Sequence, residues 1–147
     1  MNRSKILLVE DSEDDIVLTK RALEKAKIAN ELVVARDGEE ALLYLRGEGP
    51  YKDKAPDDLP AVVLLDLNMP RMSGFQFLKE LRSDERLRLL PVVVLTSSRE
   101  ERDVLESYSL GANSYVQKPV SFDEFAESVK TLSTYWLLLN VAPDRGL

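Results

Sequence analysis

The sequence predicts an α/β fold in which helices cover both faces of a parallel sheet. Short runs rich in Val, Ile and Leu alternate along the chain with longer amphipathic stretches. The run Val62-Val63-Leu64-Leu65 is apolar at every position, which is typical of a central strand buried on both faces. Strands and helices that alternate in this way are joined by right-handed crossovers, so the strands should run parallel.

Five strands and five helices follow from this alternation. The expected strands are bounded by acids, glycine or proline, and they cover residues 6–9, 31–35, 61–65, 92–95 and 114–116. The first helix should begin at a capping box formed by Ser12 and Asp15, and the fourth at one formed by Ser98 and Glu101. The later helices are expected over residues 37–46, 74–82, 100–109 and 121–140, and Gly111 should close the helix at 100–109.

Residues 47–60 interrupt the alternation of strands and helices. This segment, GEGPYKDKAPDDLP, is polar, contains three prolines and exceeds the usual length of a connection in a compact domain. It is either an ordered surface insertion between the second helix and the third strand or a flexible loop.

Composition excludes several classes of function. The 147 residues carry a formal net charge of −6, which disfavours sequence-independent binding to nucleic acid or to an anionic membrane surface. The chain has no Cys and no His, so disulfides, thiolate and imidazole chemistry and the usual zinc ligands are excluded. No run of residues resembles a signal peptide or a membrane span, and we expect a cytoplasmic protein.

Polar residues follow four of the five expected strands, at the edge of the sheet where open α/β folds bind ligands. Each of them alone could be a helix cap, a turn residue or a solvated charge. Their occurrence together at the carboxyl ends of successive strands favours a functional acidic pocket. The residues are Glu10, Asp11, Asp66, Thr96 with Ser97 beside it, and Lys118.

Three carboxylates that lie close together require a cation to neutralise their repulsion. Because the candidate ligands are oxygens only, the hard ion Mg²⁺ is favoured, and it would retain water positions for substrate oxygens. Such a site suits phosphoryl transfer: Asp66 would attack in line, and Lys118 and Thr96 would hold the phosphoryl oxygens. The product would be an aspartyl phosphate.

Four motifs in this order resemble the receiver domain of bacterial two-component response regulators. They are VEDS near the N-terminus, LLDLNMPRMSG, VVVLTSS and SYVQKP. The resemblance extends over residues 5–132 and implies a flavodoxin-like (βα)5 fold, a doubly wound parallel sheet in the strand order 2-1-3-4-5.

The resemblance also implies a role for each acid of the pocket. Asp66 would accept the phosphoryl group from a histidine kinase. Asp11 would bind Mg²⁺ directly, Glu10 would act mainly through metal-bound water, and Asn68 would offer its backbone carbonyl. Glu10 stands where Asp is more common in the family and reaches further by one methylene group.

The remaining site residues are also assigned by the resemblance. Thr96 would hydrogen-bond the phosphoryl group and Lys118 would pair with it. Pro119 would follow a cis peptide bond that orients the lysine, unless it is an ordinary trans loop proline. Tyr115 would be the switch aromatic that turns inward as Thr96 moves, unless it is simply a half-buried strand residue.

The end of the chain suggests the subfamily. We expect a single receiver domain over residues 1–147, with a helix extension and tail at 133–147 and no output domain. The tail is apolar around much of its helix, so it needs a cover. Either it folds back on its own domain, or the protein forms a homodimer built on the fourth helix, fifth strand and fifth helix. The expected dimer residues are Tyr135, Trp136 and Leu138. Tail and insertion together resemble the single-domain regulators that serve phytochrome-type histidine kinases.

Three other functions fit these residues less well. A flavodoxin-like electron carrier would need a phosphate-binding loop after the first strand, where this chain has the acidic run EDSEDD. An aspartate-nucleophile phosphatase would normally carry an acid two residues after the nucleophile, where Asn68 stands. A pseudo-receiver that only binds proteins would have little need for the full pocket. We therefore expect a phospho-accepting switch that assists its own phosphorylation and dephosphorylation, not a turnover enzyme.

Overall fold

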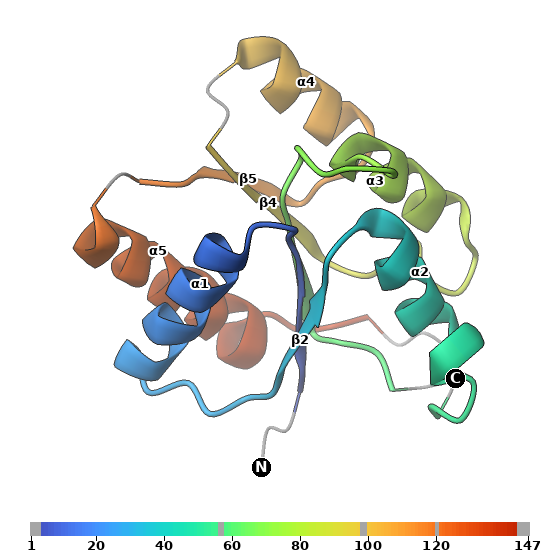
Figure 1. The fold of residues 1–147 in the computed structure, drawn as a ribbon, viewed down its shortest axis with the longest axis horizontal. Helices are drawn as coiled ribbons and strands as arrows, with labels where there is room; N and C mark the ends of the chain where they lie inside the picture. The colour runs from blue at the N-terminus through green and yellow to red at the C-terminus, as the bar shows by residue number, and fades with distance from the viewer. Residues whose placement is uncertain (1–3, 56–57, 98–99, 120, 144–147) are drawn as a thin grey trace.

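Five parallel strands form the centre of the molecule, in the order β2-β1-β3-β4-β5 (Figure 1). This computed structural model describes residues 4–55, 58–97, 100–119 and 121–143. It confirms the predicted α/β class and the strand order. The strands are β1 (Ile6–Val9), β2 (Leu32–Ala35), β3 (Val62–Leu65), β4 (Val92–Thr96) and β5 (Ser114–Gln117).

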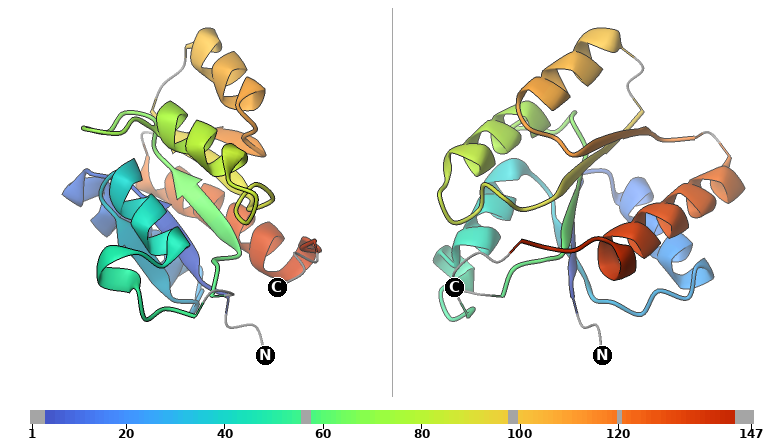
Figure 2. Two further views of the ribbon diagram at one scale, coloured as in Figure 1. Left: turned by 90° about the vertical axis from the view of Figure 1, so that its right-hand side faces the viewer. Right: turned by 180° about the vertical axis from the view of Figure 1, so that it is seen from behind.

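The helices form two layers, one on each face of the sheet. Figures 1 and 2 show α1 and α5 on one face, with α2, α3 and α4 on the other. The helices are α1 (Glu13–Lys25), α2 (Gly38–Arg46), α3 (Gly74–Ser83), α4 (Glu101–Ser109) and α5 (Phe122–Thr134).

Alternate residues of the central strands fill two separate cores. In β1, Leu7 and Val9 pack with α2 and α3, whereas Ile6 and Leu8 pack with α1 and α5. The residues of β3 alternate between the two cores in the same way. This two-sided burial explains why the apolar run 62–65 does not alternate with polar residues.

Side-chain caps start four of the five helices. Ser12, Asp37, Ser73 and Ser121 each accept a hydrogen bond from the backbone N–H three residues further on. The expected cap Ser98 lies outside the described residues. Helix α4 instead has Glu100 as its N-cap residue, which makes no side-chain capping hydrogen bond.

The described residues of the insertion are ordered and packed against the domain. A short 3₁₀ helix, Gly49–Tyr51, places the ring of Tyr51 edge-on to Tyr44, with centroids 5.2 Å apart. Lys5, just before β1, forms an ion pair of 2.9 Å with Asp58. These contacts favour the ordered insertion over the flexible loop.

Helix α5 continues directly into a π-helical turn over Tyr135–Leu139. The expected helix over 121–140 is therefore confirmed in extent, but its last turn is wider than an α-helix. Trp136 and Leu137 pack against the core between the sheet and α1 and α5. Tyr135, Leu138 and Leu139 are exposed.

The helices have the lengths expected of a globular domain. Within the described part of the chain, none is both long and apolar enough to cross a membrane.

Candidate functional site

The three predicted acids meet at the carboxyl ends of β1 and β3. These strands are neighbours in register, with Val9 opposite Leu65, so the residues that follow them emerge side by side. The N–H of Asp66 donates to the carbonyl of Val9 over 3.0 Å, which fixes Asp66 against the first strand. One carboxylate oxygen from each of Glu10, Asp11 and Asp66 lies within 4.8 Å of the others.

Two of these acids are withdrawn from water. Glu10 and Asp66 are buried, whereas Asp11 is exposed. Burial raises the pKa of Glu10 to about 7, against the opposing effect of its hydrogen bond from Lys118. Burial also raises the pKa of Asp66, and the charge of Lys118 and a hydrogen bond with Thr96 counteract this rise. The pocket is therefore a place where added positive charge is strongly favoured.

Lys118 supplies part of that positive charge from the end of β5. Its Nζ lies 2.6 Å from Oε1 of Glu10 and 2.9 Å from Oδ2 of Asp15. Burial disfavours the charged amine, but the hydrogen bonds to the two acids outweigh this and raise the pKa of Lys118. The lysine is also tied through its backbone, because its N–H donates to the carbonyl of Thr96 over 2.7 Å.

Thr96 and Tyr115 lie on the neighbouring strands β4 and β5. Thr96 is the last residue of β4 and is fully buried. Its side chain forms a hydrogen bond with Asp66. Tyr115 lies opposite Val94 in the β4–β5 pairing, is half-buried and packs against the core beneath α2 and α3. Ser97, predicted beside Thr96, is exposed.

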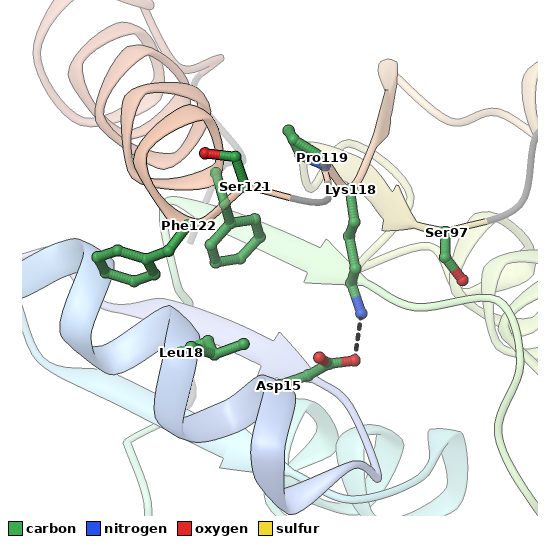
Figure 3. A pocket seen from close by; sticks show the side chains of 8 residues that line it. Asp15, Leu18, Ser97, Lys118, Pro119, Ser121 and Phe122 are labelled. Carbon is green, nitrogen blue, oxygen red and sulfur yellow. Dashed lines mark hydrogen bonds and ion pairs between the residues drawn. The ribbon is translucent and has the colours of Figure 1, made fainter.

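Asp15 is a member of the site that sequence reasoning missed. The S-x-x-D spacing predicted that its carboxylate would turn back to the N–H of Ser12. That N–H instead donates to Oε2 of Glu10 over 3.3 Å, and the Asp15 carboxylate pairs with Lys118. Figure 3 shows the side chain of Lys118, beside Pro119, reaching toward Asp15 at the start of α1.

The prediction of a cis peptide bond before Pro119 is wrong for this structure. No peptide bond in the described residues is cis, so the bond between Lys118 and Pro119 is trans. The trans form is also the intrinsically favoured one. Lys118 is oriented instead by its two carboxylate partners and by its backbone bond to Thr96.

The loop after Asp66 is held close to the acids. Asn68, the expected carbonyl ligand, is exposed in this loop, two residues after Asp66. Arg71 adopts a positive φ of 62° and forms an ion pair with the buried carboxylate of Asp37. Gly74 begins α3, and its N–H donates to the carbonyl of Leu67 over 3.1 Å.

A pocket of about 610 Å³ opens beside Lys118, between α1 and the start of α5. Figure 3 shows Leu18 and Phe122 on its apolar side and Asp15 and Lys118 on its polar side. The charged end of the lysine is therefore reachable from solvent through a partly apolar opening.

The donor set fits a hard divalent cation. Three carboxylates converge within 4.8 Å, two of them are buried with raised pKa values, and neither Cys nor His is available to favour a softer metal. Mg²⁺ is the common ion with these preferences. Glu10, Asp11 and Asp66 are the residues that could hold it.

Known proteins resemble this chain over most of its length. The sequence profile of the response regulator receiver domain matches residues 6–130. The probable methanogenesis regulatory protein FilR2 of Methanothrix harundinacea is 40% identical over 138 residues, which cover 94% of this chain and 86% of that protein. Response regulator Rcp1 of Synechocystis is 38% identical over 132 residues, covering 90% of this chain and 88% of Rcp1.

Solved structures of response regulators share the fold along nearly the whole chain. The phosphorylated cyanobacterial phytochrome response regulator RcpA superposes with a TM-score of 0.88 at 39% identity, covering 97% of this chain and 99% of RcpA. The Mn²⁺-bound form of Rcp1 gives a TM-score of 0.85 at 36% identity, covering 96% of this chain and 99% of Rcp1. This chain therefore belongs to the response regulator receiver domain family of two-component systems.

Proposed function

We propose that this response regulator is a phospho-accepting switch, in which Asp66 takes a phosphoryl group from a phosphohistidine of a sensor histidine kinase. The observation that carries the proposal is the convergence of Glu10, Asp11 and Asp66 beside Lys118. A surface that only bound proteins would gain nothing from burying two carboxylates whose pKa values are raised by that burial.

The transfer step requires Asp66 as the nucleophile. One of its carboxylate oxygens forms a bond to phosphorus while the phosphorus–nitrogen bond breaks, and the electron pair of that bond returns to the imidazole nitrogen of the kinase. The attacking carboxylate must be ionised, and the charge of Lys118 favours that form. Lys118 and Thr96 then hydrogen-bond the oxygens of the transferred group.

Glu10, Asp11 and Asp66, with the backbone carbonyl of Asn68, would hold Mg²⁺. When bound, the ion neutralises negative charge on the acids and on the phosphoryl oxygens. The Mn²⁺-bound form of the relative Rcp1 supports a divalent ion in this family. The exposure of Asp11 gives such an ion a route into the pocket.

The output of the switch would be an altered surface on α4 and β5. Thr96 would move toward the phosphoryl group, and Tyr115 on the neighbouring strand would turn further inward. Half-burial of Tyr115 against the core supports this role, because the ring has both a packed and a solvent-facing side. The protein would return to its first state by hydrolysis of the aspartyl phosphate, which the pocket assists.

The partner kinase would be of the phytochrome type, and the protein would act in the cytoplasm. The likeness to RcpA and Rcp1 over nearly the whole chain, including the insertion and the tail, supports this choice. A net charge of −6 supports a protein partner for the output over nucleic acid or an anionic membrane.

The protein would form a homodimer through its last helix, together with α4 and β5. Leu138 and Leu139 in the π-helical turn are 70% and 68% exposed. Leu105 and Tyr108 on α4 are also exposed apolar side chains. Trp136, which was expected in this surface, packs mainly against its own domain, so the interface would rest on Tyr135 and Leu138.

Labelling with acetyl phosphate tests the proposed acceptor directly. We expect Mg²⁺-dependent phosphorylation of the unaltered protein and of the control Asp53→Asn, which changes an exposed acid in the insertion. Asp66→Asn should abolish labelling, because the amide cannot act as the nucleophile. Undiminished labelling of Asp66→Asn would refute the assignment.

A further inference from the structure

Lys118 is shared between two carboxylates on different elements. Glu10 at the end of β1 lies 2.6 Å from its Nζ, and Asp15 in the first turn of α1 lies 2.9 Å away. Glu10 belongs to the group of three acids that converge within 4.8 Å, whereas Asp15 does not. Asp15 therefore contacts the lysine from outside the acidic cluster, and Figure 3 shows this contact at the start of α1.

The start of α1 holds Asp15 in this position. Its N–H donates to the capping Oγ of Ser12 over 3.3 Å, and its carbonyl accepts from Oγ1 of the buried Thr19 over 2.8 Å. The backbone at this residue is thus fixed on both sides. Because Glu10 already occupies the N–H of Ser12, the Asp15 carboxylate is left to pair with the lysine.

The two partners of Lys118 differ in how readily they can release it. The Glu10 side chain is only 3% exposed, so it would be left desolvated if the lysine moved away. The Asp15 side chain is 37% exposed and can exchange the ammonium for water at little cost. Of the two carboxylates, Asp15 is therefore the one that Lys118 can leave at the lower cost.

We propose that Asp15 is a positioning residue that competes with the phosphoryl group for Lys118 and so sets how tightly the pocket holds that group. The inference rests on the proposed function, since it requires a phosphoryl group on Asp66. Asp15 keeps the ammonium directed along the pocket before phosphorylation. On phosphorylation this ion pair of 2.9 Å must be broken before the ammonium can turn fully to the phosphoryl oxygens.

Beryllofluoride, a phosphoryl analogue that binds carboxylates, tests this competition. Its affinity is measured in excess Mg²⁺ by the ¹⁹F NMR signal of the protein-bound species, and Mg²⁺ affinity is measured separately. Asp14→Asn is the matched control, because it removes the same charge from an exposed acid in the same helical turn. Asp15→Glu retains the competing carboxylate.

We expect Asp15→Asn to bind beryllofluoride about threefold or more tightly than the unaltered protein, a size typical of one partly exposed ion pair. The beryllofluoride affinities of Asp14→Asn and Asp15→Glu should stay within about twofold of that of the unaltered protein. The Mg²⁺ affinities of Asp15→Asn and Asp14→Asn should be equal, which a general loss of structure would not produce.

Each other outcome overturns a defined part of the account. Equal affinities in Asp15→Asn and Asp14→Asn would refute the role of Asp15. Weaker binding by Asp15→Asn would show that Asp15 assists the lysine, which contradicts competition. Failure of the unaltered protein to bind beryllofluoride would overturn the proposed function itself, and the inference with it.

Discussion

Gly74 allows α3 to begin directly against the backbone that carries Asp66. A Cβ at this residue would lie 2.6 Å from the carbonyl oxygen of Asp66 and 2.8 Å from the Cα of Leu67. Both neighbours are backbone atoms in the loop that follows a central strand, so they cannot turn aside as a side chain could. The position of the acceptor therefore depends on a residue with no reactive group of its own.

Gly74→Ala should destabilise the protein by about 2 kcal/mol through overpacking, and it should also lower labelling of Asp66. Gly38→Ala is the matched control, because Gly38 is likewise the first residue of a helix. Its closest new neighbours would be side-chain atoms of Met72 and Phe77 at 3.0 Å. Urea unfolding measures the stability of both variants, and acetyl phosphate labelling measures the second effect. An equal loss of stability in the two variants would contradict this account.

Repulsion among the acids makes a second prediction at this scale. Asp11→Asn should raise the melting temperature of the metal-free protein, because it removes one of three carboxylates that lie within 4.8 Å. Mg²⁺ at a hundredfold excess over its Kd should stabilise the unaltered protein by about 3 kcal/mol. Calorimetry with and without Mg²⁺ measures both effects. If Mg²⁺ raised the melting temperature of Asp11→Asn as much as it raises that of the unaltered protein, the metal assignment would be contradicted.

Residue types and their order predicted which acids meet, but not every partner. Glu10, Asp11 and Asp66 were found because parallel strands bring their carboxyl ends to one edge of the sheet. Asp15 was missed because its spacing from Ser12 also fits a capping box, and only the structure shows that Glu10 takes the N–H involved. The acid three residues into α1 was a visible signal, yet its partner lies 103 residues away.

At the scale of elements, the end of α5 combines a packed side with an exposed one. Trp136 and Leu137 contact the core beneath α1 and α5, while Tyr135 and Leu138 face outward. The rings of Tyr135 and Trp136 meet edge to face, with centroids 4.9 Å apart. This turn therefore closes one end of the core and also offers apolar surface.

Trp136→Ala should reduce the free energy of unfolding by roughly 2 kcal/mol, since it removes a large ring that packs against the core. Tyr135→Ala should cost less than about 1 kcal/mol, because it loses mainly the ring contact. Denaturant unfolding at low protein concentration compares the two. A greater loss for Tyr135→Ala would show that the tail packs differently.

Element types were largely predictable, whereas their local geometry was not. The strands and helices match the expected ranges closely because burial imposes a regular apolar pattern. The π-helical turn was not anticipated, since the same apolar residues fit an α-helix equally well. The 3₁₀ helix of the insertion was also missed. Its order depends on packing contacts such as that of Tyr51 with Tyr44, which local sequence preference does not reveal.

At the scale of the whole molecule, the proposed dimer predicts a change in mass in solution. The double substitution Leu138→Ser and Leu139→Ser should shift sedimentation toward the monomer, because it removes two exposed apolar side chains from the surface. Leu89→Ser is the control, since Leu89 is also exposed but lies between α3 and β4. The experiment is run with and without beryllofluoride. Monomeric mass for the unaltered protein under both conditions would refute the dimer.

The identity of the residue that carries the phosphoryl group tests the central claim most directly. The unaltered protein would be phosphorylated by a phytochrome-type histidine kinase, reduced with borohydride to trap the aspartyl phosphate, and mapped by mass spectrometry of its peptides. Reduction converts a phosphorylated Asp to homoserine, so we expect that product at Asp66. Homoserine at another residue, or none in a protein shown to be phosphorylated, would contradict the account.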